Sequence, residues 1–362
     1  MRFFSFDATA TLILDGHSQE FEGWLGNMKN WRPLLKTDPI EWLLEEDNPS
    51  VRFFTLTDIL ERSENDAEAA KAKGEIMEIG VVPKILAKQA SEGYWEDPRN
   101  FYVRGKYKGT VWQLIVLAEL GADGEDERIE KACEFVLENV QDRESGGFSY
   151  LGSKVRGGEH DKVLPCLSGN MVWSLIRFGY MEDSRVQQGI NWIIKYQRFD
   201  DGISEAPKGW PYDHREKCWG KHTCHMGVVK ALKALAEIPT GKRSRDAKSA
   251  IEEGAEYVLK HHIHKRSHDL SRVSKAEWLQ FGFPLMWDTD ALEALLILLK
   301  LGYRDRRMRE AVDLVVSKQG SQGRWKLERT YNGRFQVNIE QKGKPSKWIT
   351  LNALKALKWF YS

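Results

Sequence analysis

The chain has 362 residues, of which 41% are hydrophobic and 30% charged, and its formal net charge is +1. This balance excludes the basic surface that nucleic-acid binding needs, and no apolar run is long enough to span a membrane. Four cysteines are too few for a secreted disulfide scaffold, and the first residues lack the apolar run of a signal peptide. We therefore expect a cytoplasmic protein, of undetermined oligomeric state, without nucleic acid partners or integral membrane segments.

Two kinds of helix alternate along the chain after an N-terminal extension, residues 1–35. One kind is apolar nearly all round and is expected at 51–60, 109–121, 168–180, 222–238, 288–302 and 348–360. The other is amphipathic, with apolar residues at i, i+3, i+4 and i+7, and is expected at 72–89, 127–140, 184–197, 247–262 and 306–319. The first kind suits an inner ring and the second a half-solvated outer ring.

A turn recurs in phase with these helices. It starts with Gln, continues to Gly after three or four residues and then reaches an apolar residue, at Gln89, Gln141, Gln197 and Gln319. The Gln positions are 52, 56 and 122 residues apart, and a period of this size indicates a stack or ring of similar units. We predict an all-α protein, a single α/α toroid of six helical hairpins over residues 36–362.

The paired helices and the Gln-x3-4-Gly-x-Trp turns resemble the α/α toroid of the terpenoid cyclases and the protein prenyltransferase β subunits. The turn is similar to the QW motif of squalene and hopene cyclases, in which Gln caps a helix end and Trp stacks on it. The resemblance spans about residues 40 to 362 and implies an isoprenoid small molecule as ligand. It implies cyclisation or prenyl transfer as the activity.

The segment WDTDAL carries the first candidate catalytic residues, Asp288 and Asp290. It resembles the Asp-x-Asp-Asp motif of class II terpenoid cyclases, whose middle Asp protonates an alkene. The match places Asp290 in that role, Asp288 as the first acid and Ala291 where the last acid would be. The alternative is that these acids cap a helix N-terminus.

The second candidate is a zinc site of Cys166, Cys218, His222 and Cys224. Cys166 and Cys224 precede the cores of adjacent inner helices by similar offsets, so their sulfurs should lie at one height. Three thiols and an imidazole suit tetrahedral zinc, and the alternative is a set of buried thiols. A separate histidine cluster, in a basic insertion, is expected in a solvated loop and comprises His261, His262, His264 and His268.

The third candidate is an aromatic cavity that binds substrate through Trp112, Trp173, Trp219, Trp287 and Trp348. Indole faces stabilise carbocations, although the same residues also suit core packing. Rim cations, which could receive a diphosphate or carboxylate, are Arg104, Lys106, Lys108, Lys221 and Lys347.

Two other functions remain open at this stage. One is a non-catalytic, metal-stapled binding module. The other is a glycan-processing toroid enzyme, which would need a carboxylate pair. The acids near the third turn are Asp200, Asp201, Glu205 and Asp213, and their spacing forms no recognisable pair.

Overall fold

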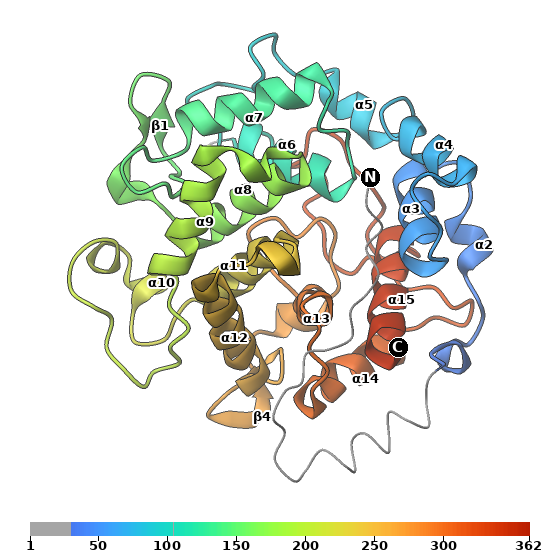
Figure 1. Cartoon of the computed structure of the whole chain (residues 1–362). Helices are drawn as coiled ribbons and strands as arrows, with labels where there is room; N and C mark the ends of the chain where they lie inside the picture. Colours follow the sequence, from blue (N-terminus) through green and yellow to red (C-terminus); the bar gives the residue numbers. More distant parts are fainter. Residues whose placement is uncertain (1–29, 104) are drawn as a thin grey trace.

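The computed structural model describes residues 30–103 and 105–362, and this part of the chain is mostly helical (Figure 1). The α-helices are α2 (Ile40–Leu43), α3 (Pro49–Phe54), α4 (Ala67–Glu75), α5 (Val81–Leu86), α6 (Thr110–Glu119), α7 (Glu127–Asn139), α8 (Pro165–Arg177), α9 (Ser184–Tyr196), α10 (Glu216–Trp219), α11 (His225–Glu237), α12 (Arg245–Lys260), α13 (Ala291–Lys300), α14 (Arg309–Ser317) and α15 (Lys347–Tyr361). Two small antiparallel hairpins pair β1 (Gly152–Ser153) with β2 (Gly157–Gly158) and β3 (Lys265–Arg266) with β4 (Asp269–Val273). A π-helical turn, Thr55–Ile59, continues α3.

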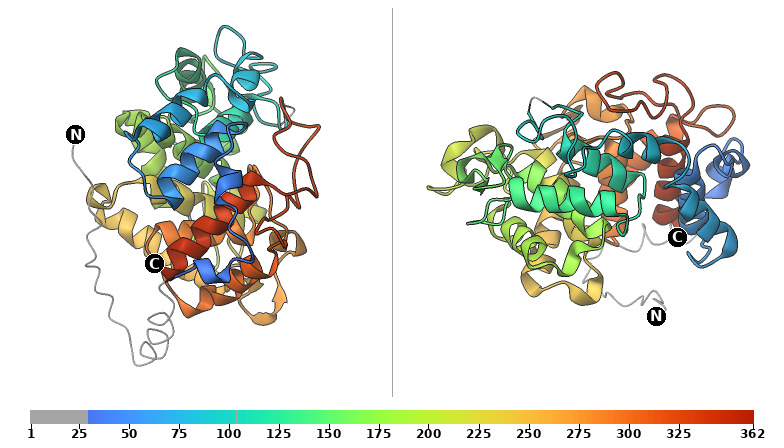
Figure 2. Two further views of the ribbon diagram at one scale, coloured as in Figure 1. Left: turned by 90° about the vertical axis from the view of Figure 1, so that its right-hand side faces the viewer. Right: turned by 90° about the horizontal axis from the view of Figure 1, so that it is seen from above.

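The apolar helices form an inner ring. In order, α6 packs on α8, α8 on α11, α11 on α13, α13 on α15, and α15 on α3. The turned view also shows α15 beside α3 (Figure 2). The ring closes between α6 and α3. Gly121, just after α6, lies so near Phe54 of α3 that a Cβ atom at Gly121 would be 2.9 Å from the Phe54 ring.

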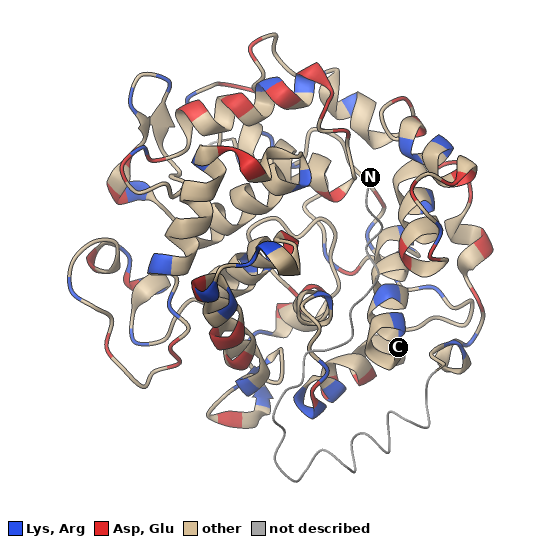
Figure 3. Ribbon diagram, in the orientation of Figure 1, with Lys and Arg blue, Asp and Glu red and all other residues tan. Residues whose placement is uncertain are grey.

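The amphipathic helices form the outer layer. Helices α4, α7, α9, α12 and α14 pack on α3, α6, α8, α11 and α13, respectively. Every residue from Thr110 to Ala118 of α6 is buried, whereas α7 buries one face and carries charges of both signs on the other (Figure 3). The predicted all-α toroid with inner and outer rings is confirmed, and α15 occupies the sixth inner position.

The recurring turn ties successive outer helices together. The Gln89 side-chain amide donates to the carbonyl oxygens of Gly93 (3.1 Å) and Arg128 (2.8 Å), the latter in the first turn of α7. Gln141 repeats this with Gly146 (2.9 Å) and Arg185 (2.6 Å), at the start of α9. Each Gln therefore connects its own turn to the next outer helix.

The aromatic residue of the turn is anchored to both layers. The indoles of Trp95 and Trp325 donate to main-chain oxygens of the preceding helix, at 2.9 and 2.7 Å. The backbone N–H of Trp95, and that of Trp325, donates to a threonine hydroxyl in the first turn of the next inner helix, at 3.2 and 3.0 Å. One residue thus connects an outer helix with an inner one.

A second repeat was not anticipated from the sequence. The outer helices α7 and α9 and the 3₁₀ turn before α14 begin with Asp-x-Arg, and Asp126, Asp183 and Asp305 each accept from the backbone N–H two residues later. Arg185 also pairs with Glu134 of α7, at 2.8 Å. Helix α12 starts instead at Ser244, and the Gln197 side-chain oxygen before it has no partner.

The prediction that the four clustered histidines lie in a solvated loop is wrong for two of them. His261 and His264 are buried, with 7% and 5% of their surfaces exposed. The reason is that α12 ends in a tight reversal, in which His261 Nδ1 lies 2.8 Å from the Tyr257 carbonyl oxygen and the β3–β4 hairpin follows.

The predicted extension, residues 1–35, lies mostly outside the described residues. From residue 30 onward the chain contacts the body: Trp31 is buried, and Lys36 donates through its backbone N–H to the Gln319 side-chain oxygen at 2.8 Å. Within residues 30–103 and 105–362, no helix combines the length and hydrophobicity that crossing a bilayer needs.

The turn geometry predicts unequal effects of two matched substitutions. Gln141→Leu removes two hydrogen bonds and with them the side-chain link between this turn and α9, so it should lower the free energy of unfolding by about 1–3 kcal/mol. Gln197→Leu removes one bond, to the adjacent Arg198 oxygen, and should have a smaller effect. Urea denaturation measures both, and an equal or larger loss for Gln197→Leu would contradict the role given to the Gln141 link.

Candidate functional site

Asp290 caps the N-terminus of α13. One of its carboxylate oxygens accepts from the Glu293 backbone N–H and the other from that of Gly282, both at 2.8 Å. Asp290 is only 2% exposed, so these bonds fix α13 to the loop around Phe281. The capping alternative therefore describes the observed geometry.

The environment of Asp290 also changes its chemistry. Burial raises the pKa of this carboxyl to about 7, although the two backbone N–H groups and Arg329 favour its ionised form. Near neutral pH the group can thus hold a proton, as a general acid must. Asp288 differs, because it is ion-paired with the Arg329 guanidinium at 2.7 Å.

An aromatic cluster covers the N-terminal ends of α6 and α13. Trp112 stacks on Tyr102 with ring centroids 4.5 Å apart, and its edge meets Tyr107 at 5.0 Å. Tyr107 accepts a hydrogen bond from the Trp287 indole at 2.9 Å and lies 4.2 Å from the ring of Tyr331. The rings of this cluster pack against one another, so Trp112 and Trp287 contribute to the packing of the hydrophobic core.

The other three predicted tryptophans lie apart from this cluster. Trp173 donates to Glu237 at 3.0 Å, near the C-terminal end of α11, and Trp219 packs against Trp192 of the outer helix α9, at 6.1 Å. Trp348 stacks on Phe283 at 4.3 Å, at the start of α15. Of the five residues, Trp348 alone borders one of the two cavities described below.

Charged side chains fill the interior between α6, α11 and α13. Lys230 donates to both oxygens of Glu293 at 2.7 Å, and Lys233 bonds Glu293 at 3.1 Å and also Glu119. Burial alone would raise the pKa of Glu293, but the two ammonium groups lower it to about 2. The Lys233 ammonium also lies 3.9 Å from the Trp173 ring centroid. This part of the ring is closed by paired charges.

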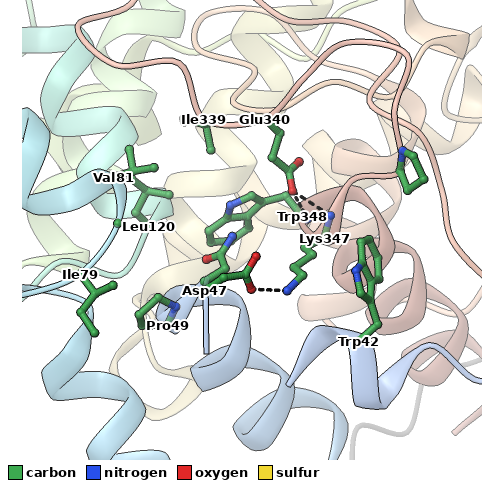
Figure 4. Close-up of a pocket in the computed structure, with 13 residues that line it drawn as sticks. Trp42, Asp47, Pro49, Ile79, Val81, Leu120, Ile339, Glu340, Lys347 and Trp348 are labelled. Carbon is green, nitrogen blue, oxygen red and sulfur yellow. Dashed lines mark hydrogen bonds and ion pairs between the residues drawn. The ribbon is translucent and has the colours of Figure 1, made fainter. Parts of the chain in front are cut away.

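A cavity of about 280 Å³ lies between α3, α5, α6 and α15 (Figure 4). Its apolar wall consists of Trp42, Pro49, Ile79, Val81, Leu120, Ile339, Pro345 and Trp348. Its polar wall contains Asp47, Asn48, Glu340 and Lys347. Trp42 also borders a second hollow of about 310 Å³, which includes Glu45 and Arg324.

Several residues that shape these sites were not predicted from the sequence. Lys230, Lys233 and Glu293 interrupt otherwise apolar inner helices, and that interruption was the available signal. Trp42 and Glu340 gave no signal, because they lie in segments outside the repeat and approach α15 only in the folded chain.

The three predicted cysteine ligands lie near one another. Burial raises the pKa of the Cys166 thiol, and the charges of Cys224 and Cys218 raise it further. His222 is exposed and faces Asp201, with 3.5 Å between its Nδ1 and the carboxylate. No group of three His, Cys, Asp or Glu side chains in the described part of the chain is arranged to hold a metal ion. Zinc here stays a prediction, which elemental analysis of the purified protein tests.

Several of the remaining acids and rim cations have local partners. Asp200 accepts from the backbone N–H groups of Gly202 and Ile203, so it organises its own turn. Asp201 lies 3.5 Å from His261 Nε2 as well as from His222. Lys347 is ion-paired with Glu45 and Asp47, and Lys106 lies over the Trp287 ring at 4.9 Å. Arg104 lies outside the described residues.

Comparison with known proteins gives structural similarity alone. No family model and no curated protein sequence matches the chain. The type II terpene cyclase MstE from Scytonema is similar at 15% identity and a TM-score of 0.40, over 93% of this chain and 98% of that one. A variant of MstE in complex with geranylgeranyl dihydroxybenzoate has 14% identity and a TM-score of 0.39, over 95% and 98%. A protein from Actinoplanes has 14% identity and a TM-score of 0.29, over 81% and 99%.

The buried carboxyl predicts a specific dependence of stability on pH. The pKa of Asp290 is about 7 in the folded chain and about 3.8, its ordinary value, after unfolding. Its contribution to stability is therefore complete below pH ~4 and is lost as pH rises through ~7, at about 1.4 kcal/mol per pH unit in between. In urea denaturation, the stability advantage of the wild type over Asp290→Asn should shrink across this range. A difference that does not vary with pH would contradict the raised pKa.

Proposed function

We propose that the protein binds a small apolar molecule of isoprenoid type in the cavity between α3, α5, α6 and α15. One observation carries the proposal: the interior beside α11 and α13 holds paired charges, whereas this cavity offers aliphatic and indole side chains beside its polar ones. Branched hydrocarbon suits such a wall, because Val81, Leu120 and Ile339 offer methyl groups for close packing.

The size of the cavity favours a short ligand. Its volume of about 280 Å³ is just below the range for small-molecule sites, which is about 300 to 1,000 Å³. Each buried CH₂ group contributes about 0.8 kcal/mol, so a ligand of about ten carbon atoms gains several kcal/mol from burial. Binding needs no catalytic group and is therefore the function that the geometry supports best.

Geraniol, a ten-carbon isoprenoid alcohol, should quench the tryptophan fluorescence of the wild type in a saturable manner, since Trp42 and Trp348 border the cavity. Val81→Phe fills the cavity and should weaken binding by about tenfold or more, equivalent to about 1.4 kcal/mol. The matched control is Ile203→Phe, at a site that is 83% exposed and outside the cavity lining. Absence of saturable binding by the wild type, or equal affinity in Val81→Phe, would refute the proposal.

Proton-initiated cyclisation is the second candidate function, and the raised pKa of Asp290 favours it. Asp290 is bonded to Gly282, and the adjacent Phe283 stacks on Trp348, which borders the cavity. In this mechanism the protonated carboxyl transfers its proton to an alkene carbon, and the faces of Phe283 and Trp348 stabilise the resulting carbocation. The stack of these two rings must open before the proton can be transferred.

If Asp290 is the acid, Asp290→Asn should abolish the conversion of a polyprenyl substrate, followed by gas chromatography and mass spectrometry. Asp288→Asn is the comparison at the same helix start, because Asp288 is ion-paired with Arg329 and does not cap α13. It should retain most of the conversion. An active Asp290→Asn protein would remove Asp290 from this role, and a wild type that binds geraniol but converts no polyprenyl substrate would leave a binding protein.

The other functions remain predictions with less support. Prenyl transfer and a metal-stapled module both depend on zinc at the cysteines, and a glycan enzyme depends on a carboxylate pair that Asp200 and Asp201 do not form in their present hydrogen bonding. Location in the cytoplasm is likewise a prediction.

A further inference from the structure

The polar wall of the cavity carries an excess of negative charge. Asp47 and Glu340 border the cavity together with a single base, Lys347 (Figure 4). Glu45, which borders the second hollow, also pairs with the Lys347 ammonium group. The cavity thus has two carboxylates for one ammonium group, and that group is already paired with a third carboxylate from outside the lining. A ligand head group of positive charge would compensate this excess, whereas an anion would add to it.

Lys347 is not available to an anionic head group. Its ammonium pairs with Glu45 at 2.8 Å and with Asp47, and the side chain is 7% exposed. It also lies 5.6 Å from the centroid of the Trp42 ring. A phosphate would have to displace two carboxylates to reach it.

Glu340 has capacity for another donor. One of its oxygens accepts from the backbone N–H of Lys347 at 2.7 Å and more weakly from that of Trp348 at 3.4 Å, and the other accepts from the Ser346 hydroxyl. A carboxylate offers about four acceptor positions, so at least one remains for a ligand. Burial raises the pKa of this carboxyl, so a cation beside it would favour its ionised form.

Indole faces complete the environment. Trp42 already holds the Arg324 guanidinium at 4.2 Å from its ring centroid, on the side of the second hollow. Trp348 also borders the cavity, and one face of its ring stacks on Phe283. Indole is the ring that binds cations best.

From this juxtaposition we propose that the ligand of the cavity is a cationic amphiphile, an apolar chain with a protonated amine that bonds Glu340 between Trp42 and Trp348. The inference rests on the proposed function, since it assigns the head group of the same ligand. It also excludes isoprenoid phosphates as preferred ligands of this cavity.

The test compares three probes with one ten-carbon chain: geranylamine, geraniol and geranyl phosphate. Isothermal titration calorimetry should show geranylamine binding about tenfold or more tighter than geraniol, because only the amine forms a hydrogen bond between two charged groups. Geranyl phosphate should bind more weakly than geraniol. Glu340→Gln should reduce the amine affinity to that of the alcohol, whereas Glu127→Gln, at an exposed site on α7, should change neither.

Retained geraniol binding by Glu340→Gln shows that the variant is folded. If that variant does not fold, Asp47→Asn replaces it, because the Asp47 side chain is 70% exposed; this change should weaken the amine and strengthen the phosphate by freeing Lys347. Equal binding of amine and alcohol, or tightest binding of the phosphate, would overturn the cationic head group and leave the proposed function intact. Failure of all three probes to bind would overturn both.

Discussion

The ring depends on four charges that are largely removed from water. Lys230 and Lys233 of α11 meet Glu293 of α13 and Glu119 of α6, and separating any of these partners would leave an uncompensated buried charge. Breaking such a pair costs about 3–5 kcal/mol, far more than a surface ion pair contributes. These three inner helices are therefore held at one spacing and one rotation about their axes.

That network also decides where the ring can hold a ligand. Its continuation through Trp173, Glu237 and Lys300 occupies the C-terminal ends of α8, α11 and α13. Opposite it, α3 and its π-helical continuation are short, and α15 contributes both Trp348 and Lys347 to the cavity. The cavity lies on this side, where the ion pairs of Lys347 stay at its edge and leave aliphatic and indole side chains beside them.

The outer layer is organised differently, by local hydrogen bonds that repeat with the sequence. Gln89 and Gln141 each reach the start of the next outer helix, and the Asp-x-Arg pairs fix those same starts. The break in this pattern occurs at α12, where the Gln197 oxygen has no partner. The same unit carries the basic insertion that buries His261 and His264, so the departure from the repeat coincides with the most irregular part of the ring.

Much of the fold was predictable from the sequence, because it follows from local periodicity. Apolar and amphipathic helices alternate with a fixed turn, and each unit repeats the same contacts, so the order of inner and outer helices required no long-range information. The segment WDTDAL likewise indicated a helix start, and Asp290 caps the N-terminus of α13.

The tertiary structure alone decided the contents of the ring. Whether a lysine in an apolar helix meets a carboxylate depends on how that helix is rotated against its neighbours, and Lys230 and Glu293 are 63 residues apart in the chain. The burial that raises the pKa of Asp290 also depends on packing between distant segments. The same is true of the cavity, where Trp42, Glu340 and Trp348 come together from segments that the sequence repeat does not relate to one another. Local periodicity fixes which face of a helix turns inward, but the partner that it meets there depends on packing between distant units.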